Sequence, residues 1–307
     1  MSELLYSYED MLNNLQMLCR RYRPLAQSRT IALTGDGRAI VLLTLGNPHA
    51  RKHLLIQASI HGREYVNSLL AMKQAEAFLA GYPCSLYCGI SYRKLLNSVC
   101  FHILPMANPD GVAISQQGPR AIRNAALRQN LCAACPGISS GQRTDFWKRW
   151  KANASGVDLN RNFSAGWQEY QGASLPGPEK YKGPFPASEP ETRAILAAAR
   201  GIPVCCVISL HSSGNLIYWD YGSRGKLHDQ ETALARMLSR VSDYPAVSVR
   251  NASADAAGCS DYFVRVRKIP AVTIENGAGP APVGLEEFGA LWAANRKLLP
   301  ALARFYL

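Results

Sequence analysis

The stretch QASIHGREYVNSLL, residues 57–70, contains the features that decide the fold of this chain. It begins inside an apolar run, HLLIQASI (53–60), whose length and composition predict a buried strand. His61 follows that strand at once, and Glu64 begins a segment whose pattern predicts a helix over 64–80. A buried strand that leads through polar residues into a helix is typical of an α/β protein.

The rest of the chain repeats this alternation of strands and helices. A helix is predicted over 9–22, and two strands joined by a turn at Gly35-Asp36-Gly37 are predicted within 30–46. Residues 115–180 are rich in Gly, Gln, Asn and Pro, and we expect them to form loops. Further strands are predicted within 98–111, 203–214 and 269–277, and further helices within 188–200, 231–241 and 285–306.

Two local signals refine these predictions. Ser188, with Glu191 three residues later, predicts a capping box at the start of the helix over 188–200. The sequence Asn-Pro-Asp-Gly at 108–111 predicts a turn after its strand. The expected fold is a single α/β domain over 1–307, with a central twisted mixed, mainly parallel β-sheet flanked by helices.

The amino-acid composition is that of a globular protein, and the net charge limits the kinds of partner that we expect. The chain has 307 residues, of which 48% are hydrophobic, and no apolar run is long enough to predict a membrane span. Its beginning does not resemble a secretory signal, so we expect a cytoplasmic protein. The formal net charge of +12 is spread along the chain without a nucleic-acid-binding motif. This charge favours an anionic substrate or polymer over nucleic acid.

The nine cysteines are expected to be reduced thiols. Their odd number, which includes the adjacent pair Cys205 and Cys206, does not indicate a disulfide framework. A four-cysteine zinc site remains an alternative, formed by two pairs that are far apart in the sequence: Cys84 with Cys88, and Cys132 with Cys135.

Polar residues follow four of the predicted strands. These are His61, the segment 108–110, His211 and Glu275. Ligands of open α/β sheets bind beyond the carboxyl ends of the strands, so we expect these residues to meet at one edge. Two histidines and one carboxylate are a common catalytic zinc set, and a separate carboxylate is then needed as general base. Each residue taken alone also fits a purely structural position.

Six segments, in this order along the chain, resemble the zinc carboxypeptidase family of metallopeptidases. They are SIHGREYVNS (59–68), NPDGV (108–112), GVDLNRNF (156–163), YKGPFPASEPET (181–192), SLHSSG with IYWDYG (209–222) and TIENG (273–277). The segment WKANASGVDLNRNF and the helix start REYVNSLL are most similar to the bacterial branch that acts on peptidoglycan, the γ-D-glutamyl-meso-diaminopimelate peptidases.

The resemblance implies a zinc carboxypeptidase-like fold and one zinc ion per chain. It implies that His61, Glu64 and His211 bind the zinc and that Glu275 is the general base. It also places Asp158 beside the first histidine, where a carboxylate would fix the tautomer of the imidazole.

The same resemblance assigns substrate contacts. Asn160 and Arg161 match the pair that binds a substrate carboxylate, a task that suits the forked guanidinium. Arg63 matches a further arginine of the cleft, and Arg63 or Lys151 would offset the charge of the oxyanion together with zinc. Asn108 and Asp110 are expected to shape the turn beside the site and not to take part in the chemistry.

Two departures from the family pattern concern the cleft. Lys151 follows Trp150, where relatives carry an arginine that stabilises the oxyanion. Ser253 lies near the place of a cleft tyrosine, and the nearby aromatic residue Tyr262 matches a different family position.

Ser260 and Asp261 would form a small polar specificity pocket. Such a pocket disfavours bulky apolar termini and suits diaminopimelate, whose distal carbon carries both an ammonium and a carboxylate.

The predicted function is therefore zinc-dependent hydrolysis of amide bonds in peptidoglycan stem peptides, with a peptide or muropeptide as the substrate. The expected bond is γ-D-Glu–meso-diaminopimelate. A conventional metallocarboxypeptidase that removes C-terminal residues is the main alternative. An acyl-amino-acid deacylase and a non-catalytic muropeptide-binding protein also remain open.

Overall fold

The computed structural model describes residues 5–133, 143–250 and 257–307. Its main strands are β1 (Ala26–Leu33), β2 (Ala39–Gly46), β3 (His53–Ala58), β6 (Cys100–Leu104), β7 (Val204–His211), β8 (Leu216–Trp219), β9 (Ala246–Ser248) and β10 (Ala271–Glu275). A small hairpin is formed by β4 (Leu86–Tyr87) and β5 (Ile90–Ser91).

The helices alternate with these strands. They are α1 (Tyr8–Arg21), α2 (Val66–Ala80), α3 (Tyr92–Ser98), α4 (Pro109–Gln117), α5 (Ala125–Ala133), α6 (Arg143–Lys148), α7 (Pro190–Ala198), α8 (Gly225–Ser242), α9 (Cys259–Arg265), α10 (Phe288–Asn295) and α11 (Leu298–Phe305). Short 3-10 turns include η1 (Gly62–Glu64) and η3 (Leu159–Arg161).

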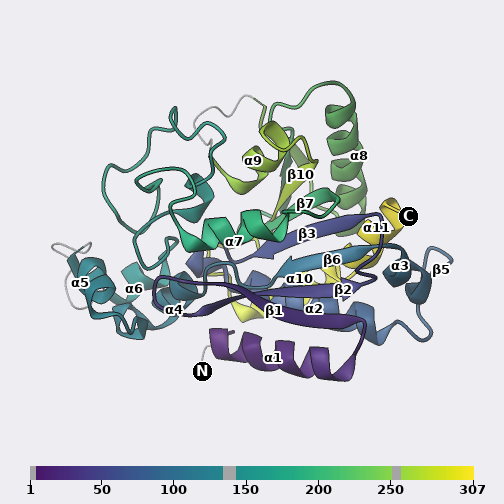
Figure 1. Cartoon of the computed structure of the whole chain (residues 1–307), viewed down its shortest axis with the longest axis horizontal. Helices are drawn as coiled ribbons and strands as arrows, with labels where there is room; N and C mark the ends of the chain where they lie inside the picture. Colours follow the sequence, from purple (N-terminus) through teal and green to yellow (C-terminus); the bar gives the residue numbers. More distant parts are fainter. Residues whose placement is uncertain (1–4, 134–142, 251–256) are drawn as a thin grey trace.

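The strands form one mixed sheet of eight strands, in the order β1-β2-β6-β3-β7-β10-β8-β9. The central strands β6, β3, β7 and β10 are parallel to one another. Strand β2 pairs antiparallel with β1 and β6, strand β8 pairs antiparallel with β10, and the edge strand β9 pairs parallel with β8. Figure 1 shows α7 lying over one face of the sheet and α1 on the opposite side of the strands. The expected α/β fold with a central mixed sheet is confirmed.

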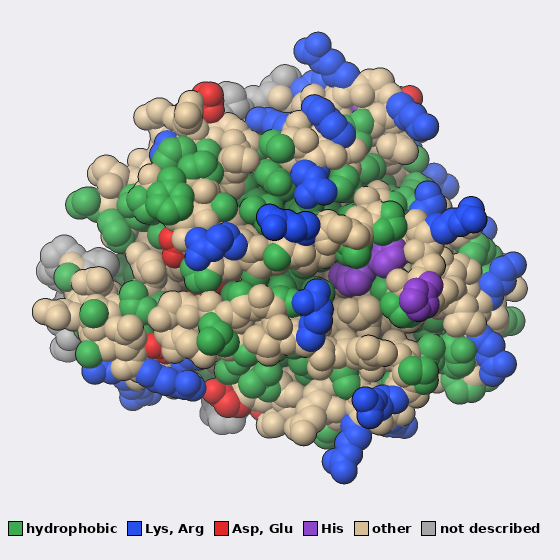
Figure 2. Space-filling view, viewed as in Figure 1, with side chains coloured by type: hydrophobic (Ala, Val, Ile, Leu, Met, Phe, Trp, Pro, Cys, Tyr) green, Lys and Arg blue, Asp and Glu red, His purple; other side chains and the backbone are tan. Residues whose placement is uncertain are grey.

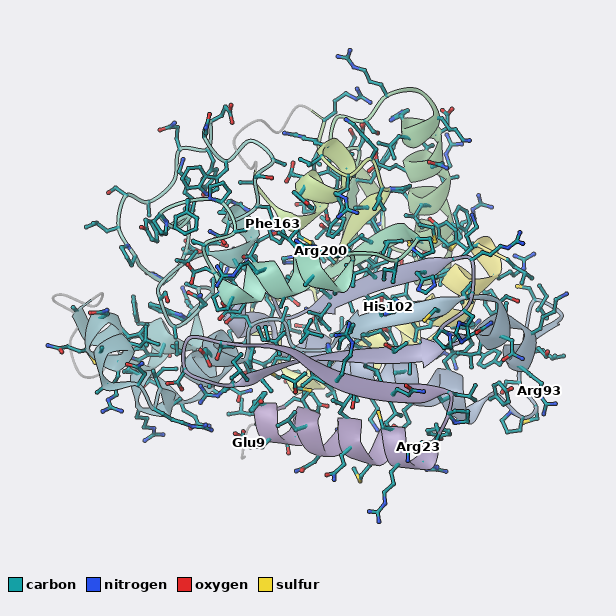
Figure 3. All side chains as sticks on the ribbon, viewed as in Figure 1. Glu9, Arg23, Arg93, His102, Phe163 and Arg200 are labelled. Carbon is teal, nitrogen blue, oxygen red and sulfur yellow. The ribbon has the colours of Figure 1, made fainter. Side chains whose placement is uncertain are left out.

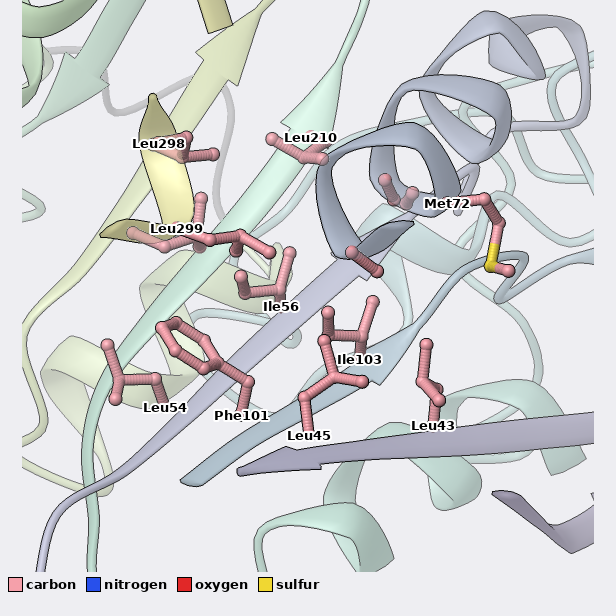
Figure 4. Close-up of a cluster of buried hydrophobic side chains, with 14 of the residues drawn as sticks. Leu43, Leu45, Leu54, Ile56, Met72, Phe101, Ile103, Leu210, Leu298 and Leu299 are labelled. Carbon is pink, nitrogen blue, oxygen red and sulfur yellow. The ribbon is translucent and has the colours of Figure 1, made fainter. Parts of the chain in front are cut away.

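Both faces of the sheet are apolar, as expected for parallel strands that are buried on both sides. Side chains of α1, α2, α8 and α11 pack against one face, in the larger hydrophobic cluster. Figure 4 shows part of this cluster, where Leu54, Ile56 and Phe101 of the strands approach Leu298 and Leu299 of α11. Helices α7 and α9 cover the other face, around Leu55 and Val207.

The segment 108–111 starts a helix and does not form the predicted turn. Asn108 is the N-cap of α4, its side chain accepts a hydrogen bond from the Gly111 amide, and Pro109 is in the first turn. Proline is tolerated there because the first amides of a helix have no intrahelical partner. Residues 115–180 are also less irregular than expected, since they contain the end of α4 and the short helices α5 and α6.

The predicted capping box at Ser188 is wrong. Helix α7 has Glu189 at its N-cap, without a side-chain capping bond. The Ser188 hydroxyl instead donates to the Glu189 carboxylate at 2.7 Å and accepts a hydrogen bond from Asn162 at 2.9 Å. A tertiary contact therefore outcompetes the local capping bond.

The helix predicted over 285–306 is divided into α10 and α11. Pro300 lies in the first turn of α11, where its missing amide costs no intrahelical bond. In a continuous helix the proline ring would clash with the carbonyl of Arg296, and this accounts for the break.

Within the described residues, no helix has both the length and the apolar character needed to cross a bilayer. The cytoplasmic location remains a prediction. Eight cysteines are described, and all of them are free thiols. Cys135 lies outside the described residues, so the alternative four-cysteine site is not tested.

Candidate active site

His61, Glu64 and His211 meet at the carboxyl ends of β3 and β7. The Nδ1 atom of His61 lies 2.8 Å from Glu64 Oε1, and the Nδ1 atom of His211 lies 3.0 Å from Glu64 Oε2. All three side chains are buried, and one ligating atom from each lies within 4.8 Å of the others. Both imidazoles thus direct a ring nitrogen at one buried carboxylate.

The exit of β3 holds this arrangement in place. Ser59 adopts a left-handed backbone conformation with φ of 52°, which turns the chain out of the sheet. Its hydroxyl lies 3.1 Å from the Glu64 carbonyl and 2.7 Å from the Ser68 hydroxyl. His61 then caps η1, where its carbonyl accepts a bond from the Glu64 amide. One tight turn therefore brings His61 and Glu64 together.

Asp158 lies on the other side of His61. Its Oδ1 is 3.3 Å from His61 Nε2, and it also accepts bonds from the backbone amides of Asn160 and Lys180. Burial alone would raise the pKa of the Asp158 carboxyl, but the hydrogen bond and charge of His61 hold it well below its usual range. An ionised carboxylate in this place leaves Nδ1 of His61 directed at Glu64.

The trio fits a zinc ion on the chemistry of its donors. Burial opposes ionisation of Glu64, yet the neighbouring charges of His61 and His211 lower the pKa of this carboxyl far below its usual value. The buried carboxylate therefore attracts positive charge into the cluster. Two imidazoles and one carboxylate are a zinc-binding set that leaves a coordination position open.

Glu275 ends β10 directly beside His211, its partner across the parallel strand pair. It lines the same cleft as the three candidate ligands. Burial raises the pKa of the Glu275 carboxyl to about 7, and Glu64 adds to this rise. The charge of His211 opposes it most, followed by those of Lys151 and Arg63. A carboxyl group that titrates near neutrality is suited to exchange protons.

Asn160 and Arg161 lie in η3 and line the cleft. The Asn160 side-chain oxygen accepts a bond from the Cys259 amide at 2.9 Å, which ties η3 to the start of α9. The Arg161 guanidinium donates to the Asn160 carbonyl and lies 5.3 Å from the centre of the Tyr170 ring. Both side chains are therefore held at the cleft by neighbours from other segments.

Lys151 and Arg63 occupy different positions. Lys151 lines the cleft, and its carbonyl accepts a bond from the Gly62 amide at 2.8 Å. Arg63 is half-buried and donates to the Arg149 carbonyl at 3.2 Å. Lys151 is thus the better placed of the two to face a substrate, although both charges act on Glu275.

Ser260 and Asp261 lie at the start of α9 and line the cleft, which has a volume of about 280 Å³. The Ser260 hydroxyl is 3.0 Å from the Thr273 hydroxyl, and Asp261 accepts a bond from the Gly258 amide at the start of α9. Asp261 also pairs with Arg265 at 3.3 Å.

Sequence reasoning missed Arg265. It lies one helical turn after Asp261 on α9 and also lines the cleft. The spacing of four residues could have indicated the pair, but α9 itself was not predicted. Tyr218 and Tyr221, two aromatic residues of the cleft wall, were missed as well.

A chain of buried amides behind the site was also missed. Asn67 donates to the Ser212 hydroxyl at 3.0 Å and accepts a bond from Asn276 at 2.8 Å. Asn276 in turn accepts a bond from Asn295 of α10 at 2.9 Å. The chain connects the residues that follow Glu64, His211 and Glu275. No local sequence pattern indicates it, because its members come from four separate segments.

The remaining predicted residues are Asn108, Asp110, Tyr262 and Ser253. Asp110 is buried in an ion pair with Arg38 at 2.8 Å and so has a structural role, like the N-cap Asn108. Tyr262 packs against Phe163, with ring centres 5.9 Å apart. Ser253 lies outside the described residues.

The sequence and the fold were compared with known proteins. The family described as zinc carboxypeptidase matches residues 11–277. A gamma-D-glutamyl-L-diamino acid endopeptidase 1 from Lysinibacillus sphaericus is 30% identical over 294 residues, which cover 94% of this chain and 69% of that protein.

Two solved structures illustrate the likeness in fold. Thrombin activatable fibrinolysis inhibitor superimposes with a TM-score of 0.75 at 20% identity, over 98% of this chain and 73% of the other. The murein-tripeptide amidase MpaA from Escherichia coli O157 superimposes with a TM-score of 0.54 at 21% identity, over 94% of this chain and 95% of that chain.

Proposed function

This chain belongs to the zinc carboxypeptidase family of peptidases, and from that premise we propose that it hydrolyses the γ-D-Glu–meso-diaminopimelate bond of peptidoglycan stem peptides. Residues 1–307 would form one catalytic domain. The observation that carries the proposal is the charged pair Asp261–Arg265 beside Ser260 in the wall of the cleft. The names of the Lysinibacillus and Escherichia relatives support the same substrate class.

His61, Glu64 and His211 would hold the zinc ion, and Asp158 would orient His61 through its Nε2 atom. When bound, zinc supplies Lewis acidity, which polarises a carbonyl group and lowers the pKa of water. The chain of amides through Asn67 and Asn276 would fix the positions of the segments that carry these ligands relative to one another.

Glu275 would act as the general base. Its carboxylate would take a proton from the attacking water and then deliver it to the amine that leaves. It must be ionised to begin this cycle, and its pKa of about 7 makes the group responsive to neighbouring positive charge. Lys151, with Arg63 behind it, would offset the negative charge that develops on the carbonyl oxygen.

Arg161 and Asn160 would bind the α-carboxylate of the diaminopimelate residue. A guanidinium forms two parallel hydrogen bonds with a carboxylate and thereby fixes its direction. The position of this pair on η3, at the cleft and apart from the candidate zinc ligands, suits the terminal residue of a peptide.

The distal end of diaminopimelate would enter the pocket formed by Ser260, Asp261 and Arg265. Its ammonium would face Asp261, and its carboxylate would face Arg265, so that the zwitterion inserts between two groups that already form an ion pair. A bulky apolar side chain would remove solvent from this ion pair without offering a polar group in exchange, which is costly. The basic surface visible in Figure 2, with many Lys and Arg side chains and few acidic ones, also favours an anionic muropeptide.

The proposal is tested by incubating zinc-loaded protein with a stem tripeptide that ends in meso-diaminopimelate and identifying the products by mass. A matched tripeptide that ends in L-lysine lacks only the distal carboxylate. We expect release of free diaminopimelate, slower cleavage of the lysine peptide, and a smaller difference between the two in Arg265→Met.

Two results would contradict the proposal. Equal cleavage of the two tripeptides by the unmodified protein would remove the proposed role of the pocket. Turnover of plain dipeptides alone would favour a conventional carboxypeptidase, and turnover of acylated amino acids alone would favour a deacylase.

A further inference from the structure

A second buried cluster of metal-ligating side chains lies at the amino ends of the parallel strands. His53 begins β3, and Cys100 and His102 lie on the neighbouring strand β6. In the register of this pair, His53 is opposite Cys100 and Leu55 is opposite His102. Because side chains alternate along a strand, all three point to the face of the sheet on which Leu55 packs with α7.

The three side chains are in close contact. His53 Nδ1 lies 2.8 Å from His102 Nε2, and Cys100 Sγ lies 3.5 Å from the same nitrogen. Their exposed fractions are 4% for His53, 0% for Cys100 and 8% for His102. Figure 3 labels His102 on β6.

The hydrogen bonds define which atoms can accept a cation. The Ala50 carbonyl lies 2.9 Å from His53 Nε2, so this nitrogen must carry the proton. Nδ1 of His53 then has a free electron pair that points at His102. A backbone carbonyl that holds the far nitrogen of an imidazole is the usual way in which a metal-binding histidine is oriented.

The protonation states of His102 and Cys100 are compatible with metal binding. Burial lowers the pKa of His102 to about 4, so the ring is neutral at pH 7. Burial raises the pKa of the Cys100 thiol to about 12, so it is protonated until a cation binds. Metals commonly drive this deprotonation, because a coordinating thiol releases its proton.

We propose that His53, Cys100 and His102 form a second zinc site, separate from the catalytic cluster. Two imidazoles and one thiolate are a set that zinc accepts, with the fourth position left to water. On binding, Cys100 would release its thiol proton to solvent, and His102 would move its proton from Nε2 to Nδ1. Each ion bound would therefore release one proton.

The spacing of the ligands sets the movement that binding requires. Two nitrogens that are each about 2.0–2.1 Å from a tetrahedral zinc lie about 3.3–3.4 Å apart. The two ring nitrogens are now 2.8 Å apart, so they would have to separate by roughly half an ångström.

This site makes a prediction that the catalytic site does not. The resemblance to the family implies one zinc ion per chain, whereas occupancy of both clusters would give two. The catalytic cluster has only nitrogen and oxygen donors, and the second cluster has a sulfur donor. A spectroscopic signal from a metal–thiolate bond therefore cannot come from the catalytic cluster, and its loss in Cys100→Ser would assign it to the second site.

The test uses Co²⁺ as the probe, added to metal-free protein while absorption and bound metal are measured. We expect two Co²⁺ ions per chain and a thiolate-to-cobalt charge-transfer band in the near ultraviolet. Cys100→Ser should lose this band and one equivalent of metal, while peptidase activity is kept. Cys205→Ser is the matched control, because its thiol lies at the same end of the sheet but donates to the His53 carbonyl at 3.2 Å.

Measurements on the unmodified protein test the proposal even if a variant does not fold. One Co²⁺ per chain without a thiolate band in the unmodified protein would show that His53 and His102 form only a hydrogen-bonded pair. A band that persists in folded Cys100→Ser would assign the metal to another cysteine. Equilibrium dialysis of the unmodified protein against Zn²⁺ gives an independent count, in which one ion per chain overturns the proposal.

Discussion

The two ends of β3 carry clusters of similar composition in different surroundings. At the carboxyl end, His61 and Glu64 with His211 lie in a cleft beside a further carboxylate, Glu275, which titrates near neutrality. At the amino end, His53 lies with the Cys100 thiol and the His102 imidazole, and all three side chains are buried. The five residue steps of β3, at about 3.3 Å each, place roughly 16 Å between its ends.

The difference shows what makes a cluster of ligands catalytic. Both ends can offer three donors to a cation, but only the carboxyl end adds a proton acceptor, cationic side chains and space for a peptide. The carboxyl ends of parallel strands lead into loops that can supply these groups, whereas the amino-end cluster lies within the packed strands. The amino-end site is therefore suited to bind a metal and the carboxyl-end site to use one.

The largest expected effect comes from removal of a ligand at the carboxyl end. His211→Ala should lose the catalytic zinc and reduce peptidase activity to background, because two ligands hold the ion poorly. The control is His102→Gln, which should keep full activity. Elemental analysis and an activity assay on both folded variants check this. Full activity in His211→Ala would assign the catalytic metal elsewhere.

The next effect concerns the proton acceptor. Glu275→Gln should keep the fold and the zinc but lower kcat by about 10²–10⁴-fold, since an amide cannot take a proton from water. Steady-state kinetics together with a metal count would measure the change. A kcat close to that of the unmodified protein would move the base to another group.

Arg161→Lys tests how the substrate carboxylate is bound. The lysine keeps the charge but loses one of two hydrogen bonds, each worth about 1.5–3 kcal/mol, so kcat/KM should fall by roughly 10–150-fold. Zinc content should not change, because Arg161 is not among the three candidate ligands.

A second substrate allows a double-mutant-type cycle, in which the unmodified protein and Arg161→Lys are each measured on the acid and the amide form. A muropeptide with its terminal carboxylate amidated should already be a poor substrate and lose little more on mutation. If the two losses simply add, Arg161 does not contact that carboxylate, and the proposed orientation of the substrate is wrong.

The smallest expected effect is a shift in pH dependence. Glu275 must be ionised, so kcat/KM should fall as the pH drops through the pKa of this group. Lys151 lowers that pKa, and Lys151→Met should therefore move the acidic limb of the profile to higher pH. An acidic limb that does not move, or that moves to lower pH, would show that Lys151 does not lower the pKa of Glu275.

The sequence predicted the parts of the site that depend on local order. His61 and Glu64 could be identified because a buried strand, a polar turn and a helix follow one another within 57–70. His211 and Glu275 could be identified because each ends an apolar run of strand length. The parallel arrangement of these strands then brings the residues together.

The missed features depend on contacts between distant segments. Asn67, Asn276 and Asn295 form one buried chain of amides, yet each alone resembles an ordinary polar residue of a helix or loop. Ser188 fits a capping motif, but Asn162 and Glu189 bind its hydroxyl in the fold. The cluster around His102 was missed for the same reason, since only the register of β3 and β6 brings it together.

Anomalous diffraction at the zinc edge, from crystals of catalytically active zinc-loaded protein, tests the central claim most directly. The account predicts a strong peak enclosed by His61 Nδ1, the Glu64 carboxylate and His211 Nδ1. Active crystals that lack this peak, with zinc found only near His53 and His102 or elsewhere, would contradict it.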